Sequence, residues 1–269
     1  MSEASKANGK YYVDNKNEFM GERGHDMVVK KLIDAVEYIN NKNVVCIDVG
    51  TNVGDEIKFI RMIAPESTRR ILTFEPNPVN VKILKNKFTG CSDIILHDEA
   101  VSKEKGILPF YIWKDQKENV DGNGLGGLRS GGSFVKNVNV ITLDNVLADS
   151  KYDNAVIKYI KIDTEGNDTN VLYGLKNNLN RVKYILFEAS DCLDDIRGPG
   201  ESEPLKKCID YLDANGFDTY RIGEKRMLRI NGTDWNPVYE KVKFWSNCFS
   251  IKKNDAIITK IINKDGYYL

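Results

Sequence analysis

Acidic residues that follow buried apolar runs are the first candidates for chemistry in this sequence. They are Asp48, Glu75, Asp163, Glu165 and Glu188. A carboxylate can accept the hydrogen bonds of a ribose, face an ammonium group, or take a proton from a hydroxyl. A strand covered on both faces rarely ends in acids for packing alone, because an unpaired buried carboxylate costs several kcal/mol. We therefore expect some of these side chains to bind a ligand or to take part in catalysis.

The segment from Asp48 to Gly54, DVGTNVG, predicts a tight turn between a buried strand and a helix. Gly50 and Gly54 allow backbone angles that other residues avoid, and Asn52 tolerates a left-handed backbone. Glu75 ends the next strand about 25 residues later, a spacing typical of a carboxylate that binds a ribose. The dinucleotide pattern G-x-G-x-x-G and the P-loop pattern G-x-x-x-x-G-K-[ST] are both missing. The turn therefore indicates a nucleoside-bearing cofactor and disfavours NAD.

Strands and helices alternate along most of the chain. We expect strands at 44–49, 70–74, 93–97, 108–113, 138–142, 156–162, 182–188, 217–222 and 243–251. We expect helices at 26–40, 54–64, 77–88, 168–179, 204–215 and 254–263. This alternation predicts a doubly wound, Rossmann-like α/β fold whose sheet is mostly parallel, with an antiparallel C-terminal strand. In such a sheet the ligand lies beyond the carboxyl ends of the strands, where the acids above would project.

One large core suffices for a chain of 269 residues that is 41% hydrophobic. We expect an N-terminal arm and helix at 1–42, a main domain at 43–252, and a C-terminal helix or tail at 253–269. Residues 1–24 of the arm are polar. The main domain carries an insertion at 114–136 that is too rich in glycine for a helix or a strand. The insertion is either a plain surface loop or a flexible lid in which Arg129 contacts a substrate.

Composition excludes several classes of partner. Lys and Arg together number 39, as do Asp and Glu, so no basic excess marks a nucleic-acid-binding protein. No apolar run is long enough for a membrane span, and the N-terminus lacks a signal sequence. The five cysteines form no C-x-x-C pair, which favours reduced thiols in a cytoplasmic protein. The sequence leaves the oligomeric state open.

Six motifs then follow one another in a fixed order: DVGTNVG at 48–54, FEPNP at 74–78, TLDNVL at 142–147, KIDTEG at 161–166, VLYG at 171–174 and LFE at 186–188. Together they resemble the FkbM-type S-adenosylmethionine-dependent methyltransferases, whose pattern is close to D-x-G-A-N-x-G, F-E-P, T-L-D and K-I-D-x-E-G-x-E-x-x-V-L-x-G. The resemblance covers residues 44 to about 190. Thr51 replaces the usual alanine, and Asp168 stands where a glutamate is usual.

The resemblance implies S-adenosylmethionine as the cofactor and assigns its binding residues. They are Asp48, Val49, Gly50, Asn52, Gly54, Glu75, Pro76, Asn77, Glu99, Ala100 and Asp163. Glu75 would accept both ribose hydroxyls, while Pro76 and Asn77 would shape the wall of the adenosine site. The segment 97–101 corresponds to the adenine-side loop of the family. Asp48 would either hold the turn or face the ammonium group of the cofactor.

Three acids are the candidates for catalysis: Asp163, Glu165 and Glu188. By resemblance the first two lie near the sulfonium and the acceptor, where a carboxylate can take or orient a hydroxyl proton. Capping of the following helix is the structural alternative. Asp163, Glu188 and Asp191 would be the ligands if a divalent cation took part, although the family pattern does not require one.

The expected function is transfer of a methyl group to a hydroxyl of a sugar or glycan. The choice of oxygen and of a sugar rests on the family, whose members act on sugars, glycans, glycolipids and polyketide-like products. The alternatives in the same class are an N-methyltransferase and a natural-product O-methyltransferase. An alternative of another class is a non-catalytic subunit that binds S-adenosylmethionine for a partner enzyme.

Overall fold

The computed structural model describes residues 1–35, 43–65, 67, 69–112, 126–128, 133–189, 204–242, 246–256 and 261–262. Contacts between residues divide the chain into two compact units. The central unit consists of Asn40–Val182 and Asp195–Ser202. The terminal unit consists of Met1–Ile39, Lys183–Asp194 and Glu203–Leu269.

The central unit is built on a parallel sheet with the strand order β8-β1-β2-β3. These strands are Val156–Ile162, Val44–Val49, Arg70–Phe74 and Ile94–His97. All six residues of β1 are buried, as expected for a strand covered on both faces. Strands β2 and β3 follow β1 on one side, and β8, which comes later in the chain, lies on its other side. This reversal of strand order makes a switch point between β1 and β8.

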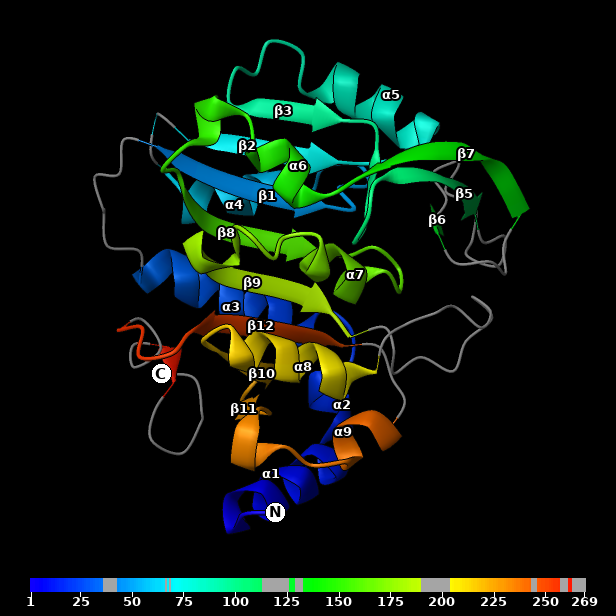
Figure 1. Cartoon of the computed structure of the whole chain (residues 1–269). Coiled ribbons are helices and arrows are strands. Elements are labelled where there is room, and N and C mark those ends of the chain that lie inside the picture. The colour runs from blue at the N-terminus through cyan, green and yellow to red at the C-terminus, as the bar shows by residue number, and fades with distance from the viewer. Residues whose placement is uncertain are drawn as a thin grey trace. The chain divides into compact units, whose positions relative to one another are not determined.

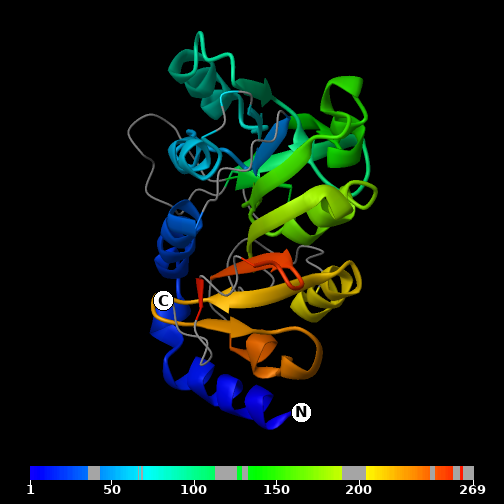
Figure 2. The same ribbon diagram turned by 90° about the vertical axis from the view of Figure 1, so that its left-hand side faces the viewer.

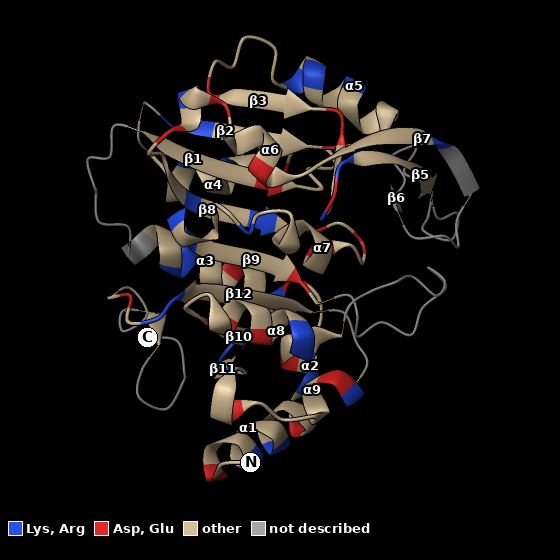
Figure 3. Cartoon of the chain, viewed as in Figure 1, with Lys and Arg blue, Asp and Glu red and all other residues tan. Residues whose placement is uncertain are grey.

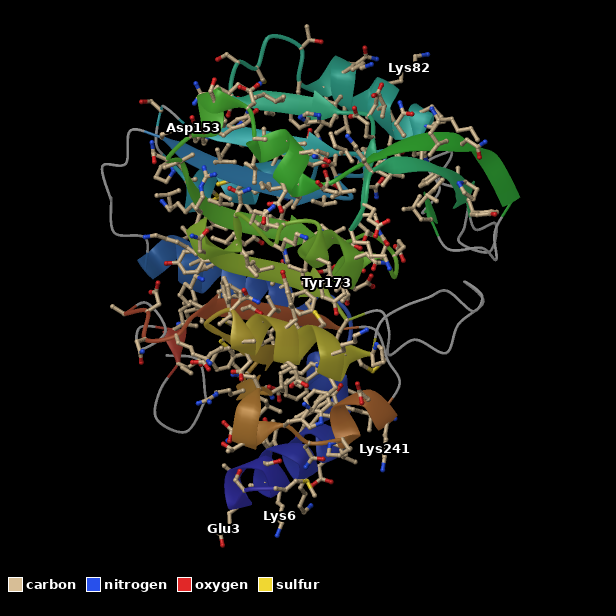
Figure 4. The ribbon with its side chains drawn as sticks, in the orientation of Figure 1. Glu3, Lys6, Lys82, Asp153, Tyr173 and Lys241 are labelled. Atoms are coloured by element: carbon tan, nitrogen blue, oxygen red, sulfur yellow. The ribbon has the colours of Figure 1, made fainter. Side chains whose placement is uncertain are left out.

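Helices cover both faces of this sheet. Helices α4 (Ile57–Ile63) and α5 (Pro78–Lys87) lie on one face, and α6 (Leu143–Leu147) and α7 (Asp168–Tyr173) lie on the other (Figures 1 and 2). Lys82 of α5 points away from the sheet into solvent (Figure 4). Parallel strands with helices on both sides confirm the predicted doubly wound, Rossmann-like α/β fold.

Two predicted helices are shorter than expected. The helix expected at 54–64 begins only at Ile57, because Gly54 takes a positive φ of 80° that an α-helix excludes. The helix expected at 168–179 ends at Tyr173. Beyond it the chain binds Asp144 of α6: the Gly174 carbonyl accepts from the Asp144 N–H at 2.9 Å, and the Asn177 N–H donates to the Asp144 carboxylate at 3.0 Å. These contacts replace a further helical turn.

A second, smaller sheet with the order β4-β7-β5-β6 belongs to the same unit. Its strands are Ala100–Val101, Ser133–Ile141, Gly106–Ile112 and Gly126–Gly127. The short strand β6 corrects the expectation that the glycine-rich insertion contains no strand. A Cβ at Gly126 would stand 2.7 Å from the Phe110 ring, so glycine is what lets β6 pair there. Residues 133–136 of the insertion belong to β7, so they also form strand where none was predicted, whereas residues 114–125 and 129–132, Arg129 included, lie outside the described residues.

The terminal unit carries an antiparallel sheet with the order β11-β10-β12-β9. Its strands are Met227–Arg229, Phe217–Ile222, Asn247–Lys252 and Val182–Glu188. Its helices are α1 (Glu3–Asp14), α2 (Lys16–Phe19), α3 (Arg23–Ala35), α8 (Leu205–Ala214) and α9 (Val238–Lys241). Strand β12 is antiparallel to both neighbours, as predicted for the C-terminal strand.

The polar arm predicted at residues 1–24 contains two helices, which sequence analysis missed. Glu3 and Lys6 point from α1 into solvent, and they give the segment its polar character (Figure 4). Tyr12 and Phe19 are nevertheless fully buried and pack ring against ring at 5.2 Å. At the other end, residues 253–256 form a turn where a helix was predicted, and 257–260 lie outside the described residues.

Candidate functional site

The turn after β1 is held by hydrogen bonds to the end of β2. The N–H groups of Gly50 and Thr51 both donate to the Phe74 carbonyl, at 2.9 and 3.1 Å. The Thr51 hydroxyl donates to the Asp48 carbonyl at 2.9 Å and accepts from the Phe74 N–H at 3.2 Å. Threonine in place of the family's alanine thus adds two bonds within the turn. Asn52 takes the predicted left-handed conformation, with a φ of 50°.

Glu75 joins the turn after β1 to the loop after β2. One of its carboxylate oxygens accepts from the Asn52 N–H at 2.8 Å, and the other accepts from the Asn77 N–H at 2.8 Å. The Asn80 side chain of α5 adds a bond to the Asn52 side chain at 3.0 Å. Burial raises the pKa of Glu75 to about 7, although the two main-chain donors oppose this shift. Each oxygen keeps a lone pair with which it can accept a hydrogen bond from a hydroxyl.

The residues predicted beside Glu75 have defined structural contacts. Asn77 caps α5, because its side-chain oxygen accepts from the Val79 N–H at 3.0 Å. Pro76 between them is half-buried. Gly54 faces α5, where a Cβ would stand 2.6 Å from the Phe88 ring. The predicted cofactor residues from Asp48 to Asn77 therefore come together at one end of β1 and β2.

Asp48 is completely buried at the end of β1. Neither of its carboxylate oxygens has a hydrogen-bond partner among the described residues. Burial raises the pKa of Asp48 to about 7, although the nearby ammonium group of Lys161 opposes the shift. A buried carboxylate without partners is costly, so its neighbours must compensate it or a ligand must reach it.

A group of charged and polar side chains surrounds Asp48 on one face of β1 and β8. Lys161 is the register partner of Asp48 across the two strands, and it donates to the Asp163 carboxylate at 3.0 Å. Two residues before Lys161 on β8, the Tyr159 hydroxyl donates to the buried Glu56 carboxylate at 3.0 Å. Burial by itself lowers the pKa of Lys161, but the carboxylates of Asp163, Asp48 and Glu56 outweigh it and raise the pKa. Lys161 is therefore a cation at neutral pH. We call Asp48, Glu56, Tyr159, Lys161 and Asp163 the charged cluster.

The turn after β8 is held by Asp168. Its carboxylate accepts from the Thr164 N–H and from the Gly166 N–H, both at 3.2 Å. Glu165 takes a left-handed φ of 57°, which is rare for a non-glycine residue, and Gly166 follows with a φ of 99°. Asp168, the shorter acid in place of the family's glutamate, thus accepts the main-chain hydrogen bonds that hold this turn.

The two turns touch each other. The Asp163 N–H donates to the Val49 carbonyl at 2.9 Å. A Cβ at Gly50 would stand 1.8 Å from the Asp163 carbonyl oxygen, so only glycine fits at this position. Asp163, predicted for catalysis, is therefore adjacent to the turn predicted for the cofactor.

The segment after β3 lies beside the same edge. The Glu75 N–H donates to the His97 carbonyl at 3.1 Å, and the His97 ring stacks on Phe74 with centroids 4.6 Å apart. Burial lowers the pKa of His97, although the Glu99 carboxylate 3.6 Å away opposes the shift. Glu99 is partly exposed, whereas Ala100 is buried at the start of β4. Both residues thus follow the strand next to the ribose candidate, and their role in an adenine-side loop stays a prediction.

Glu188 and Asp191 do not belong to this arrangement of the central unit. Glu188 is buried at the end of β9 in the terminal unit, opposite Asn247 of β12. Asp191 lies outside the described residues. Among the residues that the structure describes, no group of three His, Cys, Asp or Glu side chains could hold a metal ion. The catalytic role of Glu188 and the alternative metal site stay predictions.

Sequence analysis missed the contributions of Lys161, Glu56 and Tyr159. One signal was available, because Lys161 interrupts an apolar strand two residues before Asp163. Residues two apart on a strand share a face, so the pair was predictable. Glu56 gave no such signal, since only the packing of α4 brings it to Tyr159. Over the described residues of each unit, acidic and basic positions are interspersed on the ribbon (Figure 3). In the same ranges no helix has the length and apolar character needed to cross a bilayer.

A search of curated proteins found no match. The solved structures that resemble the chain include the methyltransferase FkbM from Methylobacillus flagellatus KT, with 12% identity and a TM-score of 0.46. The chain aligns over 92% of its own length with 58% of that chain, and so spans less than two thirds of it.

Two further structures are more distant in sequence. The O-methyltransferase from Bacillus cereus in complex with SAH has 8% identity and a TM-score of 0.43, over 94% of this chain and 92% of that one. The precorrin-6y C5,15-methyltransferase from Geobacter metallireducens GS-15 has 11% identity and a TM-score of 0.37, over 84% and 88%. Structures this distant do not identify a substrate for the chain.

The family comparison is decisive. Residues 48–219 match the Methyltransferase FkbM domain, which is more than half of the chain. The match begins at Asp48 and includes both turns described above. The chain therefore belongs to the FkbM family of S-adenosylmethionine-dependent methyltransferases.

Proposed function

We propose that this chain transfers the methyl group of S-adenosylmethionine to a hydroxyl of a sugar or glycan. One observation carries the proposal: the Asp163 main chain is bonded to the end of β1, while its carboxylate remains 27% exposed. The site thus has a carboxylate beside the turn expected to hold the cofactor. A carboxylate at this place can orient an acceptor hydroxyl and take its proton.

The residues of the central unit fit an adenosyl cofactor. Glu75 presents two oxygens, each fixed by one main-chain donor and each able to accept one ribose hydroxyl. Gly50 leaves room where a side chain would collide with Asp163. Glu99 and Ala100 follow β3 on the side expected for adenine. When bound, S-adenosylmethionine supplies a methyl carbon made electrophilic by the positively charged sulfur.

The protein's own task is then to bring a hydroxyl into line and to remove one proton. Asp163 is our candidate for both, and Lys161 holds its carboxylate at 3.0 Å. Glu165 is a second candidate, because its strained backbone sets the direction of a half-buried acidic side chain in the same turn. The choice of a sugar or glycan is supported by the range of acceptors known for the family, and a formal net charge of zero is compatible with an uncharged acceptor.

Calorimetry tests the cofactor half of the proposal. We expect micromolar binding of S-adenosylhomocysteine and no heat with NAD. Folded protein that does not bind S-adenosylhomocysteine would refute the proposed function.

A radiolabelled methyl-transfer screen tests the acceptor half. Oligosaccharides, amines and small phenolic or polyketide-like alcohols are offered in parallel, and the methylated position is mapped. Transfer to a sugar oxygen supports the proposal, whereas transfer only to an amine or only to a natural-product alcohol overturns the choice of acceptor. Cofactor binding without transfer to any acceptor would favour the non-catalytic subunit. Repeating a positive reaction with chelator, and then with added magnesium, decides whether a cation is required.

A further inference from the structure

Lys161 connects the exposed and the buried parts of the charged cluster. Tyr159, Lys161 and Asp163 alternate along β8 and its carboxyl end, so their side chains leave the same face of the sheet. The Lys161 side chain is 15% exposed and that of Asp163 is 27% exposed, whereas Asp48 is completely buried. The ammonium group therefore lies between a buried carboxylate and one that solvent can reach.

Charge explains why the Lys161 side chain stays at this place. The carboxylates of Asp163, Asp48 and Glu56 all act on its ammonium group. Glu56 is itself held by the Tyr159 hydroxyl at 3.0 Å, and Asp48 is fixed in β1 opposite Lys161. A lysine has a flexible stem, and its position becomes defined only when anions surround it. Two of these carboxylates, those of Asp48 and Glu56, are buried in the core of the unit.

We propose that Lys161 is a positioning residue, which the buried carboxylates of Asp48 and Glu56 hold in place and which in turn orients the Asp163 carboxylate toward the acceptor. This inference rests on the proposed function, in which Asp163 handles the acceptor hydroxyl. It gives Asp48 a role that needs no contact with a ligand. It also explains how the protein tolerates a fully buried acid whose oxygens lack hydrogen bonds among the described residues.

Crystal structures of variants test the positioning directly and need no acceptor. Lys161→Met removes the cation but leaves buried acids uncompensated, so it can fail to fold. The double variant Lys161→Met, Glu56→Gln removes one charge of each sign and retains an acceptor for Tyr159. In this double variant we expect the Asp163 carboxylate to leave its wild-type position, while the two main-chain bonds to Glu75 persist. An unchanged Asp163 carboxylate would overturn the proposal.

Kinetics supply the second readout, with the acceptor found by the methyl-transfer screen. The folded double variant should lose 10- to 100-fold in kcat and bind S-adenosylhomocysteine within about threefold of wild type. Lys161→Arg, which keeps the charge and the donors, should recover most of the lost kcat. Lys82→Met on the solvent-exposed side of α5 is the control and should leave kcat within about twofold.

Two kinetic outcomes would contradict the inference. An unchanged kcat in the folded double variant would show that Asp163 does not depend on Lys161. A parallel loss of cofactor affinity and kcat would show that Lys161 serves the cofactor instead. If the wild-type protein methylates no acceptor, the proposed function fails, yet the crystal structures still decide whether Lys161 positions Asp163.

Discussion

The turns after β1 and β8 have similar backbones, but the carboxylates beside them are held in different ways. Each contains a non-glycine residue with a left-handed φ, Asn52 at 50° and Glu165 at 57°. The Asn52 N–H of the first turn and the Asn77 N–H of the loop after β2 donate to the Glu75 carboxylate, and Glu75 is 5% exposed. In the second turn a lysine side chain binds the Asp163 carboxylate, which is 27% exposed.

We relate this difference to the two halves of the proposed methyl transfer. A carboxylate between two main-chain donors has a fixed position, which suits a cofactor that is the same for every acceptor. The Asp163 carboxylate, which Lys161 holds, can be reached from solvent, which suits the acceptor that we propose. The strain differs as well, because asparagine adopts the left-handed conformation at lower cost than glutamate. We therefore expect changes at the first turn to affect cofactor binding and changes at the second to affect turnover.

The largest effect should follow replacement of Asp163. Asp163→Asn keeps the shape of the side chain but removes its capacity to take a proton, so kcat should fall by about 10²- to 10⁴-fold. Binding of S-adenosylhomocysteine should stay within about threefold of wild type. Steady-state kinetics and calorimetry measure the two quantities, with Asp153→Asn on an exposed loop as the control (Figure 4). Near-normal turnover would remove Asp163 from catalysis.

Replacement of Glu75 should have the opposite profile. In Glu75→Gln one oxygen becomes an NH₂ group that faces a main-chain N–H, and the charge that we expect to bind the ribose is lost. We expect an affinity loss for S-adenosylhomocysteine of about 100-fold, since hydrogen bonds to a charged group contribute about 1.5–3 kcal/mol each. Calorimetry measures this, and Glu104→Gln in an exposed turn is the matched control. Wild-type affinity in the variant would exclude Glu75 from the ribose site.

The pKa values of Glu75 and Asp48, both raised to about 7, predict two effects of pH. The folded protein binds more protons than the unfolded chain between about pH 4 and 7, so its free energy of unfolding falls as the pH rises through this range. Tm should therefore be higher at pH 5.5 than at pH 8, and Glu75→Gln should reduce the difference.

Cofactor affinity should change with pH in the other direction. The ionised Glu75 carboxylate is the better acceptor, so affinity for S-adenosylhomocysteine should fall up to about tenfold from pH 8 to pH 6. Titration calorimetry at both values measures the change. A flat profile in the wild-type protein would contradict an ionised Glu75 in the complex.

Asp168 tests how firmly the second turn must be held. Asp168→Ala leaves the Thr164 and Gly166 N–H groups without their acceptor, which costs about 1–3 kcal/mol for buried donors. We expect kcat to fall about tenfold with little change in cofactor affinity. Asp168→Glu, which restores the residue usual in the family, should stay within about threefold of wild type in kinetic assays. Equal losses in both variants would show that the acid has another role.

The smallest effect should come from backbone strain in the same turn. Glu165→Gly removes a left-handed glutamate and should raise the free energy of unfolding by up to about 1 kcal/mol, part of the gain being lost to the more flexible unfolded chain. Denaturant unfolding measures the change. A more stable variant with a lower kcat would mean that the glutamate side chain serves function, whereas a loss of stability would contradict the strain argument.

Periodicity and turn chemistry predicted the core of the central unit well. Strands β1, β2 and β8 have the predicted ends, because runs of β-branched residues bounded by glycine or acids leave few alternatives. The prediction was wrong where distant partners decide the backbone. Helix α7 stops at Tyr173 because the following residues bind Asp144, and β6 pairs through glycines that leave room for Phe110.

The sequence by itself determined the family, the parallel sheet and the acids at its edge, since these follow from local patterns of residues and from motifs in a fixed order. Only the tertiary structure decided which groups surround those acids. Side chains far apart in the chain, such as Glu56 and Tyr159, meet because α4 packs on β8. Burial then raises the pKa of Asp48 and of Glu75, and the Lys161 ammonium group donates to the Asp163 carboxylate. Burial and charge depend on what lies nearby in space, which spacing along the chain does not specify.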